Sequence, residues 1–383
     1  MFVRAAATST IGVTLGPYLA RLDLAGADLG IVIAAGLAGA AVAAIAATLF
    51  ADRIGRRRFL LAITALSAVG TVAFAFASAP IALAAAGFVG MVNGMGRDRG
   101  AQPILETAAL PATASDAERT QVVARYTMLQ DIGHALGALA AGIPAWVMTT
   151  TTVAAQRSVV LSCAGASAVI LVLYIGLGDV IERDRAKKLT MTPESRSIVT
   201  KISALFTLDS LGSGFLTTAM LSYFFFERFG VGEDVTAVLF FAARAMNALS
   251  HLGAAWLAKR IGLVPTMVFT HIPSSLLLVT VAFAPSFTVA AVLFIVREGL
   301  VEMDVPTRTS YVLAVVRPEE RTLASGVTNL VRLAAWAIAP AFAGLLMTDD
   351  TLYVPLVAGA TLKIAYDLLL WRAFRHIRPP EER

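Results

Sequence analysis

A few ionisable residues stand at spacings that would let them handle protons. Glu298 and Glu302 are four residues apart, so a helix would place both carboxylates on one face. Like charges in that arrangement repel unless a proton, a cation or a solute intervenes, which makes this pair our best candidate for proton coupling. Asp131 and His134 are three residues apart and could relay a proton. A structural hydrogen bond is an equally good interpretation of that second pair, and a two-residue metal site is a much weaker one.

The composition indicates that these residues belong to an integral membrane protein. Hydrophobic residues make up 57% of the 383 residues and charged residues only 15%, where soluble proteins have about 25%. So few charges could not cover a soluble surface. The single cysteine, Cys163, excludes an internal disulfide or a zinc cluster. A net charge of +5 would favour nucleic-acid binding in a soluble protein, but here we relate it to membrane topology and expect no nucleic-acid partner.

Apolar runs of about 20 residues predict an all-α protein with twelve transmembrane helices. The first run is the weakest, and a cleaved signal peptide is its alternative, disfavoured because no polar domain follows. Lys and Arg near the predicted span ends number twenty on the side of the N-terminus and three on the other, so we expect both termini in the cytoplasm. The membrane would be the plasma or inner membrane. The predicted spans are residues 3–20, 28–51, 59–78, 81–101, 124–148, 157–178, 200–226, 233–258, 264–284, 286–310, 323–347 and 352–374.

The chain repeats itself. Residues 51–55 return as 258–262, an offset of 207, and Glu118-Arg119-Thr120 returns as 320–322, an offset of 202. A parallel repeat of six helices is typical of transporters, in which two similar bundles rock about a shared site. We therefore predict an N-terminal six-helix bundle, a polar cytoplasmic linker and a C-terminal six-helix bundle, at residues 1–178, 179–198 and 199–383.

Charged residues within the predicted spans are candidates for solute binding or proton coupling. A charge at the bilayer centre costs roughly 2.5–3.5 kcal/mol on insertion scales, so such residues usually face the protein interior. Interhelical pairing is an equally good interpretation for the lone charges Asp209 and Arg332. Lys363 and Asp367, at i,i+4, are most simply a pair that satisfies itself. The full candidate set is Arg97, Asp98, Asp131, His134, Asp209, Arg297, Glu298, Glu302, Asp304, Arg308 and Arg332. For Arg97, Arg99 and Arg308, snorkelling or latching near a helix end is favoured over contact with solute.

A basic loop between the second and third spans is a candidate gate. Gly55 permits a tight reversal, and the arginines hold the loop at an anionic membrane surface. Asp52 ends a helix, where a carboxylate is poorly placed unless an arginine or another helix N-terminus receives it. The candidate gating residues are Asp52, Arg53, Gly55, Arg56 and Arg57. A merely positive cytoplasmic loop is an equally good interpretation.

This loop resembles the one in the major facilitator superfamily, whose pattern is Gly, three residues, Asp, two residues, Gly and two basic residues. Asp52, Gly55, Arg56 and Arg57 match, while Thr48 stands at the first Gly. The resemblance covers essentially the whole chain. It implies the two-bundle fold of that family, lipid-facing third, sixth, ninth and twelfth spans, and secondary transport by alternating access.

The resemblance leaves the branch unassigned. Gly90 stands where the family's fourth span has an Arg, and only Gly137 and Gly142 remain of the antiporter pattern in the fifth span. These departures weaken an assignment to drug/proton antiporters.

Taken together, the residues predict a proton-coupled secondary transporter for a small, polar organic solute. We expect a monomer in the lipid bilayer, no metal and no cofactor beyond the proton gradient, with export slightly favoured over uptake. The sequence lacks a Gly-x-x-x-x-Gly-Lys-Ser/Thr loop, which disfavours ATP hydrolysis. An intramembrane enzyme is an alternative, but His-Glu-x-x-His and Gly-x-Ser-x-Gly are absent. A receptor or scaffold is another, although neither needs buried charges of both signs.

Overall fold

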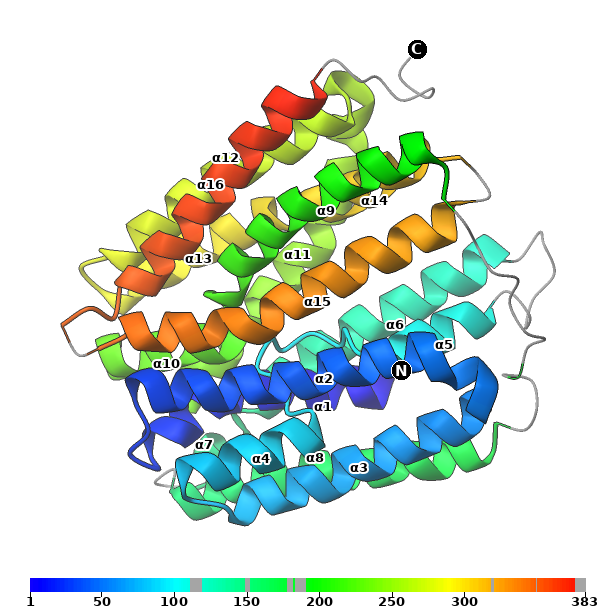
Figure 1. Ribbon diagram of the computed structural model, residues 1–383. Coiled ribbons are helices and arrows are strands. Elements are labelled where there is room, and N and C mark those ends of the chain that lie inside the picture. The colour runs from blue at the N-terminus through cyan, green and yellow to red at the C-terminus, as the bar shows by residue number, and fades with distance from the viewer. Residues whose placement is uncertain are drawn as a thin grey trace. The chain divides into compact units, whose positions relative to one another are not determined.

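The chain is helical throughout the part that the structure describes. The computed structural model describes residues 1–110, 119–148, 152–177, 182, 191–317, 320–348 and 350–375, and these form sixteen α-helices without a strand (Figure 1). The predicted all-α fold is therefore confirmed. Glu118 and most of the predicted linker, residues 179–198, lie outside the described residues.

The twelve predicted spans all correspond to helices of the structure. Eight helical segments are long and apolar enough to cross a membrane, the longest of them Pro193–Phe229. Eight of the predicted spans are each a single helix. These are α1 (Phe2–Ala20), α2 (Gly26–Ile54), α3 (Arg56–Phe76), α8 (Val153–Ile175), α11 (Glu233–Ile261), α12 (Leu263–Ala282), α15 (Arg321–Leu346) and α16 (Val354–Phe374).

The other four predicted spans are each divided into two consecutive helices. The fifth, seventh and tenth spans have short interruptions of two or three residues. The fourth has a long one, residues 91–100, which we call the span-four break. The pairs are α4 (Pro80–Gly90) and α5 (Ala101–Ala109), α6 (Arg119–Ala140) and α7 (Ile143–Val147), α9 (Pro193–Gly214) and α10 (Thr218–Phe229), and α13 (Phe287–Val301) and α14 (Asp304–Ala314).

The prediction of one continuous helix over residues 81–101 is therefore wrong, and the local sequence explains why. Met91, at the start of the break, has a φ of 51°, which ends α4 in the left-handed region. The Asn93 side chain then forms hydrogen bonds with nearby backbone groups. Its Nδ2 atom donates to the Arg97 carbonyl at 2.8 Å, and its Oδ1 atom accepts from the Met95 N–H at 2.9 Å. Such local bonds compete with helix formation.

The chain folds as two compact units. Unit 1 comprises residues 1–187, 217–241 and 340–348. Within it α1 packs against α6, α8 and α10, α3 packs against α4 and α8, and α2 packs against α4 and α5. The contact of α1 with α6 depends on a small residue, because a Cβ on Gly137 would lie 2.1 Å from the Ala6 carbonyl oxygen.

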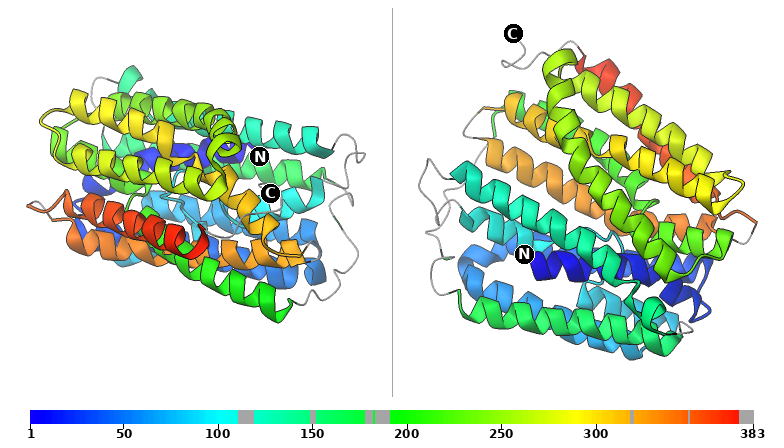
Figure 2. Two further views of the ribbon diagram at one scale, coloured as in Figure 1. Left: turned by 90° about the horizontal axis from the view of Figure 1, so that it is seen from above. Right: turned by 180° about the vertical axis from the view of Figure 1, so that it is seen from behind.

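Unit 2 comprises residues 188–216, 242–339 and 349–383. Within it α12 packs against α13, α14 and α16, and α9 packs against α16 (Figure 2). An apolar cluster in this unit includes Phe206, Met267, Tyr311, Tyr366 and Phe374. The predicted division of the chain at residues 179–198 stays a prediction.

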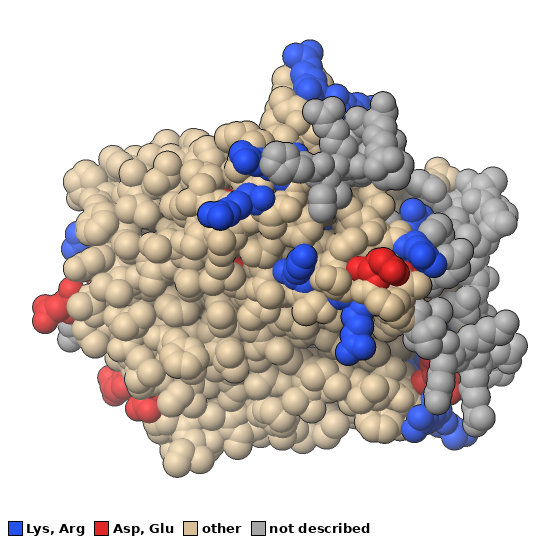
Figure 3. Space-filling view, turned by 45° about the horizontal axis from the view of Figure 1, so that its top comes forward, with Lys and Arg blue, Asp and Glu red and all other residues tan. Residues whose placement is uncertain are grey.

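Apolar side chains cover the outer faces of the third, sixth, ninth and twelfth spans. Val69 on α3 is 66% exposed and Val172 on α8 is 67% exposed, and Phe269 on α12 and Leu368 on α16 are also more than half exposed. The face in Figure 3 is largely free of Lys, Arg, Asp and Glu. Water would not favour such a surface, whereas lipid does. The chain is a multi-pass membrane protein.

Candidate functional site

A buried ionic network lies inside unit 2, which we call the Asp209 network. Asp209 on α9 accepts hydrogen bonds from Lys363 of α16 at 2.9 Å and from Arg308 of α14 at 3.1 Å. Arg332 of α15 lies 3.9 Å from the same carboxylate. Arg308 also donates to Asp304, one helical turn before it, at 2.7 Å. None of these side chains is more than 12% exposed, so the network belongs to the interior.

His271 of α12 extends this network to a third carboxylate. Its Nδ1 atom lies 3.0 Å from both oxygens of Asp367, and its Nε2 atom lies 3.1 Å from Nζ of Lys363. An ammonium group can only donate, so Nε2 must accept and the proton must sit on Nδ1, where it bonds to Asp367. The geometry therefore assigns a neutral imidazole within a continuous chain from Asp367 through His271 and Lys363 to Asp209.

The residues named so far are balanced in formal charge. With His271 neutral, the carboxylates of Asp209, Asp304 and Asp367 are matched by three cations, those of Arg308, Arg332 and Lys363. Both arginines also lie over the Phe206 ring, at 5.3 and 5.9 Å from its centre. Pairing and cation–π contact let charges remain inside a membrane protein, where a lone charge would be costly.

A second network lies inside unit 1, centred on Arg4 of α1. Arg4 donates through Nε to Asp98 at 2.6 Å and through both terminal nitrogens to Glu106, at 2.6 and 2.8 Å. Tyr174 and Tyr126 accept its remaining N–H groups at 2.7 and 3.5 Å. Both phenols donate in turn to Glu106. All five donors of the guanidinium are thus in use, and Arg4 ties together α1, the span-four break, α5, α6 and α8.

His134 of α6 also holds the span-four break. Its Nε2 atom accepts the backbone N–H of Asp98 at 2.9 Å, and the neighbouring Gln130 donates to the Asp98 carbonyl at 3.2 Å. An imidazole nitrogen that accepts a hydrogen bond is unprotonated, so His134 is neutral in this arrangement. The predicted relay between Asp131 and His134 stays a prediction.

Comparison with known proteins decides the family. The sequence profile of the Major Facilitator Superfamily matches residues 1–340. The chain belongs to this superfamily. It is similar to the uncharacterized membrane protein YJR124C of Saccharomyces cerevisiae, with 24% identity covering 97% of this chain and 91% of that protein.

Solved structures of superfamily transporters have the same fold. The nucleoside transporter NupG has a TM-score of 0.76 at 14% identity, covering 98% of this chain and 97% of its own. A D-xylose-proton symporter has a TM-score of 0.69 at 15% identity, covering 97% and 95%. Membership makes this protein a membrane transporter, not an enzyme, and one that binds a small-molecule substrate within the membrane.

The loop that carried the resemblance to the superfamily is held by charges at both ends. Arg56 donates to Asp52 at 2.7 Å, so an arginine receives the carboxylate that ends α2. Gly55 between them has a φ of 102°, which a residue with a side chain rarely adopts. Arg57 donates to the last carbonyls of α8, and Arg53 is exposed. The Glu182 carboxylate accepts the first two N–H groups of α3, at 3.0 and 3.2 Å.

Glu298 and Glu302, the pair proposed for proton coupling, differ in their contacts and in their place on α13. Glu298 of α13 pairs with Arg297 and accepts from the Asn247 amide at 2.9 Å. Helix α13 ends at Val301, so Glu302 is its C-cap. Glu298 therefore has a cation beside it, and a proton shared between Glu298 and Glu302 stays a prediction.

The structure brings together four candidate residues from three helices, Asp209, Asp304, Arg308 and Arg332, of which the sequence spacing links only Asp304 and Arg308. It also corrects one interpretation. Lys363 and Asp367 bond mainly to other residues and not to each other. Lys363 bonds to Asp209 and His271, and Asp367 bonds to His271. A signal was present: charges on helices expected to face lipid must point inward and find partners there.

The Arg4 network contains further residues that the sequence did not single out. Arg4 is one of the twenty basic residues on the side of the N-terminus, and the candidate set does not include Glu106, Tyr126 or Tyr174. Arg97, in contrast, was a candidate, and its carbonyl is tied to Asn93 in the span-four break. An arginine inside the first apolar span was the available signal, since such a residue needs buried acidic partners.

Proposed function

We propose that this transporter couples the movement of a small, polar organic solute to protons, with export as the favoured direction. Its main support is the position of His271 between Asp367 and Lys363 in a buried, charge-balanced network. The proton gradient supplies the energy, and no cofactor takes part. The protein acts as a monomer with both termini on the cytoplasmic side of a plasma or inner membrane.

Protonation of His271 would change the pairing of two helices. Its Nε2 atom accepts from Lys363, and an imidazolium donates from both nitrogens, so proton uptake must break that contact. Lys363 would then keep only its contact with Asp209, and the formal charge of the network would rise from zero to +1. An unbalanced charge inside the membrane is unfavourable, so α12 and α16 would favour a different arrangement. Two arrangements selected by one proton are what coupling to alternating access requires.

The solute class follows from the charges inside each unit. Charged groups of both signs, carboxylates and cations, suit a polar or zwitterionic molecule better than a purely apolar one. The solved structures with this fold include transporters named for nucleosides and for D-xylose with protons, which are polar organic solutes. At these low identities they serve as examples of what the fold moves.

The test begins with a solute. Thermal-shift screening of the purified full-length protein against metabolites identifies ligands, because a ligand that binds only the folded state raises the melting temperature. Flux of those ligands is then measured in proteoliposomes with an imposed pH gradient. We expect accumulation that a protonophore abolishes. His271→Gln should keep solute exchange but lose the response to the pH gradient, whereas His251→Gln, on α11, should behave as the parent protein.

Each arm has a contradicting result. Accumulation that ignores the protonophore would refute proton coupling, and the absence of flux for every stabilising ligand would refute transport of those ligands. A pH response that survives His271→Gln would remove that residue from the mechanism. The direction of transport is tested by measuring solute accumulation in inverted and in right-side-out vesicles, without ATP and with the same imposed pH gradient. Accumulation confined to right-side-out vesicles would overturn export.

A further inference from the structure

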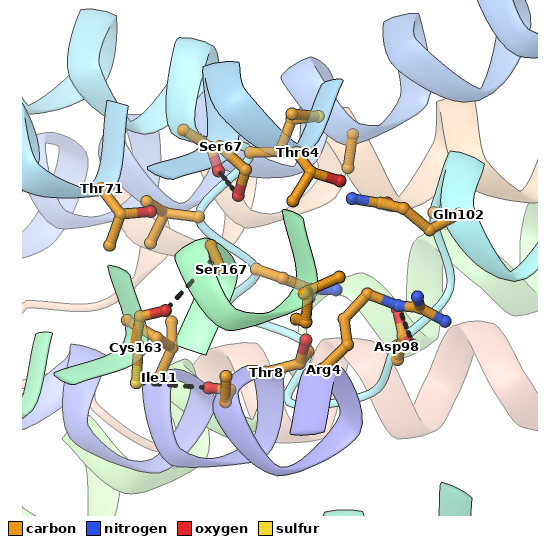
Figure 4. A pocket seen from close by; sticks show the side chains of 18 of the residues that line it. Arg4, Thr8, Ile11, Thr64, Ser67, Thr71, Asp98, Gln102, Cys163 and Ser167 are labelled. Atoms are coloured by element: carbon orange, nitrogen blue, oxygen red, sulfur yellow. Dashed lines mark hydrogen bonds and ion pairs between the residues drawn. The ribbon is translucent and has the colours of Figure 1, made fainter. Parts of the chain in front are cut away.

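A cavity lined by apolar and polar side chains lies within unit 1, beside the span-four break. Its volume is about 80 Å³, and it is bounded by α1, α3, α8 and the residues that follow α4 (Figure 4). One water molecule needs about 10–15 Å³ of such space, so the cavity has room for several waters or for a small ion with its waters, and it is smaller than the roughly 150 Å³ cavity that binds benzene. Non-helical backbone at membrane depth is tolerated where it lines such a cavity.

Several polar groups that line the cavity have no hydrogen-bond partner among the described residues. Thr64 is 1% exposed, and its hydroxyl has no partner. The side chains of Thr8, Thr71 and Gln102 also line the cavity and are less deeply buried, and the described part of the chain offers them no hydrogen bond. Asp98 uses only Oδ2, for Arg4, so its Oδ1 atom also lacks a protein donor within the described chain. A buried hydroxyl such as that of Thr64 normally has a partner, which is water or a ligand where the protein offers none.

The charges beside the cavity favour a cation over an anion. Arg4 spends all five of its donors on protein groups, so none is left for an anion. Asp98 lines the cavity and keeps one carboxylate oxygen without a protein donor in the described chain. In the described chain neither Arg97 nor Arg99 is among the residues that line the cavity. A carboxylate oxygen and an unpartnered hydroxyl are hard oxygen ligands, which suit a cation.

The internal repeat shows what occupies the equivalent place in unit 2. Gly55 and Gly262 are 207 residues apart and precede α3 and α12, and the same offset takes Thr64 to His271. Helix α8 packs on α1 and α3 as α16 packs on α9 and α12.

For the other helices we align the two units on one close contact in each. The Cys163 thiol donates to the Ala7 carbonyl at 3.6 Å, and a Cβ on Gly212 would lie 2.9 Å from the Gly359 carbonyl oxygen. Aligning these contacts sets offsets of 205 for α1 with α9 and 196 for α8 with α16.

These offsets pair Arg4 with Asp209 and Ser167 with Lys363. The three residues Arg4, Thr64 and Ser167, which all line the cavity, are therefore the counterparts of Asp209, His271 and Lys363. Where unit 2 has the ammonium group of Lys363, unit 1 has the short Ser167 side chain and a cavity.

We propose that this cavity binds a small monovalent cation, held by Oδ1 of Asp98 and the hydroxyl of Thr64. The cation takes the place that the Lys363 ammonium has in the other repeat. Its source is either an inorganic ion or the ammonium group of a small amine, and the two share the same chemistry at these oxygens. The site is separate from the Asp209 network and does not depend on proton coupling there.

The only cysteine of the chain reports on this site, because Cys163 lines the cavity. We would measure the rate at which methyl methanethiosulfonate, a small neutral reagent, modifies Cys163 in the purified full-length protein. Sodium, potassium, ammonium and methylammonium chlorides are compared with N-methyl-D-glucamine chloride at constant ionic strength. At ten times its dissociation constant, a bound cation should slow modification about tenfold. Protection by sodium or potassium alone assigns an inorganic ion, and protection by ammonium and methylammonium alone assigns an amine.

Two variants separate the site from a general salt effect. Thr64→Val removes a hydroxyl that bonds to no described residue, so it should fold normally and lose the protection. Thr14→Val is the matched control, because the Thr14 hydroxyl on α1 is equally buried and unpartnered yet does not line the cavity. It should keep the protection. Equal modification rates in every salt, or protection that survives Thr64→Val, would overturn the proposal.

Melting temperature provides an independent readout should Cys163 prove unreactive. The protecting cation should raise the melting temperature of the parent protein and of Thr14→Val but not that of Thr64→Val. The same increase in all three proteins, or in none of them, would refute the site.

Discussion

The Nζ atom of Lys363 lies 2.9 Å from Oδ1 of Asp209, and neither side chain is more than 5% exposed. This contact joins α16 to α9 inside unit 2. The other oxygen of Asp209 faces Arg308 and Arg332, at 3.1 and 3.9 Å. One carboxylate therefore serves three cations. Replacing the carboxylate leaves three charges under-compensated, whereas replacing one cation leaves the carboxylate with two partners.

This asymmetry predicts that Asp209→Asn destabilises the protein more than Lys363→Met. Breaking a buried pair costs roughly 3–5 kcal/mol, and we expect Lys363→Met near the lower end. The double variant should lose less than the sum, because each residue's removal relieves the other. Unfolding of the purified protein measures all three, with Lys201→Met, an exposed lysine on α9, as a control within about 0.5 kcal/mol. Strict additivity would contradict the pairing.

A second prediction concerns the contact of α1 with α6. Gly137→Ala should destabilise the protein, because the added Cβ would lie 2.1 Å from the Ala6 carbonyl oxygen and the backbones would have to separate. Gly165→Ala is the matched control, since nothing lies within 4 Å of a Cβ there and alanine is the better helix former. Melting temperatures should fall for the first variant and stay or rise for the second. Equal melting temperatures would show that the two helices are not held at that distance.

The helices could be predicted from the sequence because their length is a physical requirement. A chain that crosses a membrane needs about 20 apolar residues for each crossing, and the apolar runs coincide with the helices to within a few residues. The loop at Asp52 was equally visible, because Gly55 and its neighbours act over a few residues. Short-range patterns of this kind can be read directly.

Contacts between distant segments could not be predicted in the same way. Asp209 and Lys363 are 154 residues apart, and nothing in the spacing indicates that they meet. The helical pattern also suggested a pair of Lys363 with Asp367, because i,i+4 neighbours are the only partners that one helix reveals. Similarly, apolar composition across residues 81–101 concealed the span-four break, where the Asn93 side chain satisfies local backbone groups.

Membrane orientation provides a third prediction. We expect the loop after α2 in the cytoplasm and the α10–α11 connection outside, from the distribution of Lys and Arg. In a Cys163→Ser background, Arg53→Cys should react with an impermeant maleimide only after the membrane is permeabilised. Arg228→Cys, on the last turn of α10, should react in intact cells. Both native arginines are exposed, so access to the side chains does not limit the reaction. The reverse pattern would invert the proposed topology.

The last prediction concerns pH and the N-terminus of α9. The Glu320 carboxylate accepts hydrogen bonds from the Ser195 side chain and the Thr192 backbone, which lower its pKa below the usual range. Because the pKa is lower in the folded state, the carboxylate stabilises the protein above the pKa of an unfolded glutamate, and this contribution is lost as pH falls through the folded value. The melting temperature of Glu320→Gln should therefore lie below that of the parent near neutral pH, and the difference should shrink in acid. Glu194→Gln, an exposed acid in the first turn of the same helix, should show a smaller difference at neutral pH. A difference for Glu320→Gln that stays constant with pH would mean that the charge of this carboxylate does not hold α9 in place.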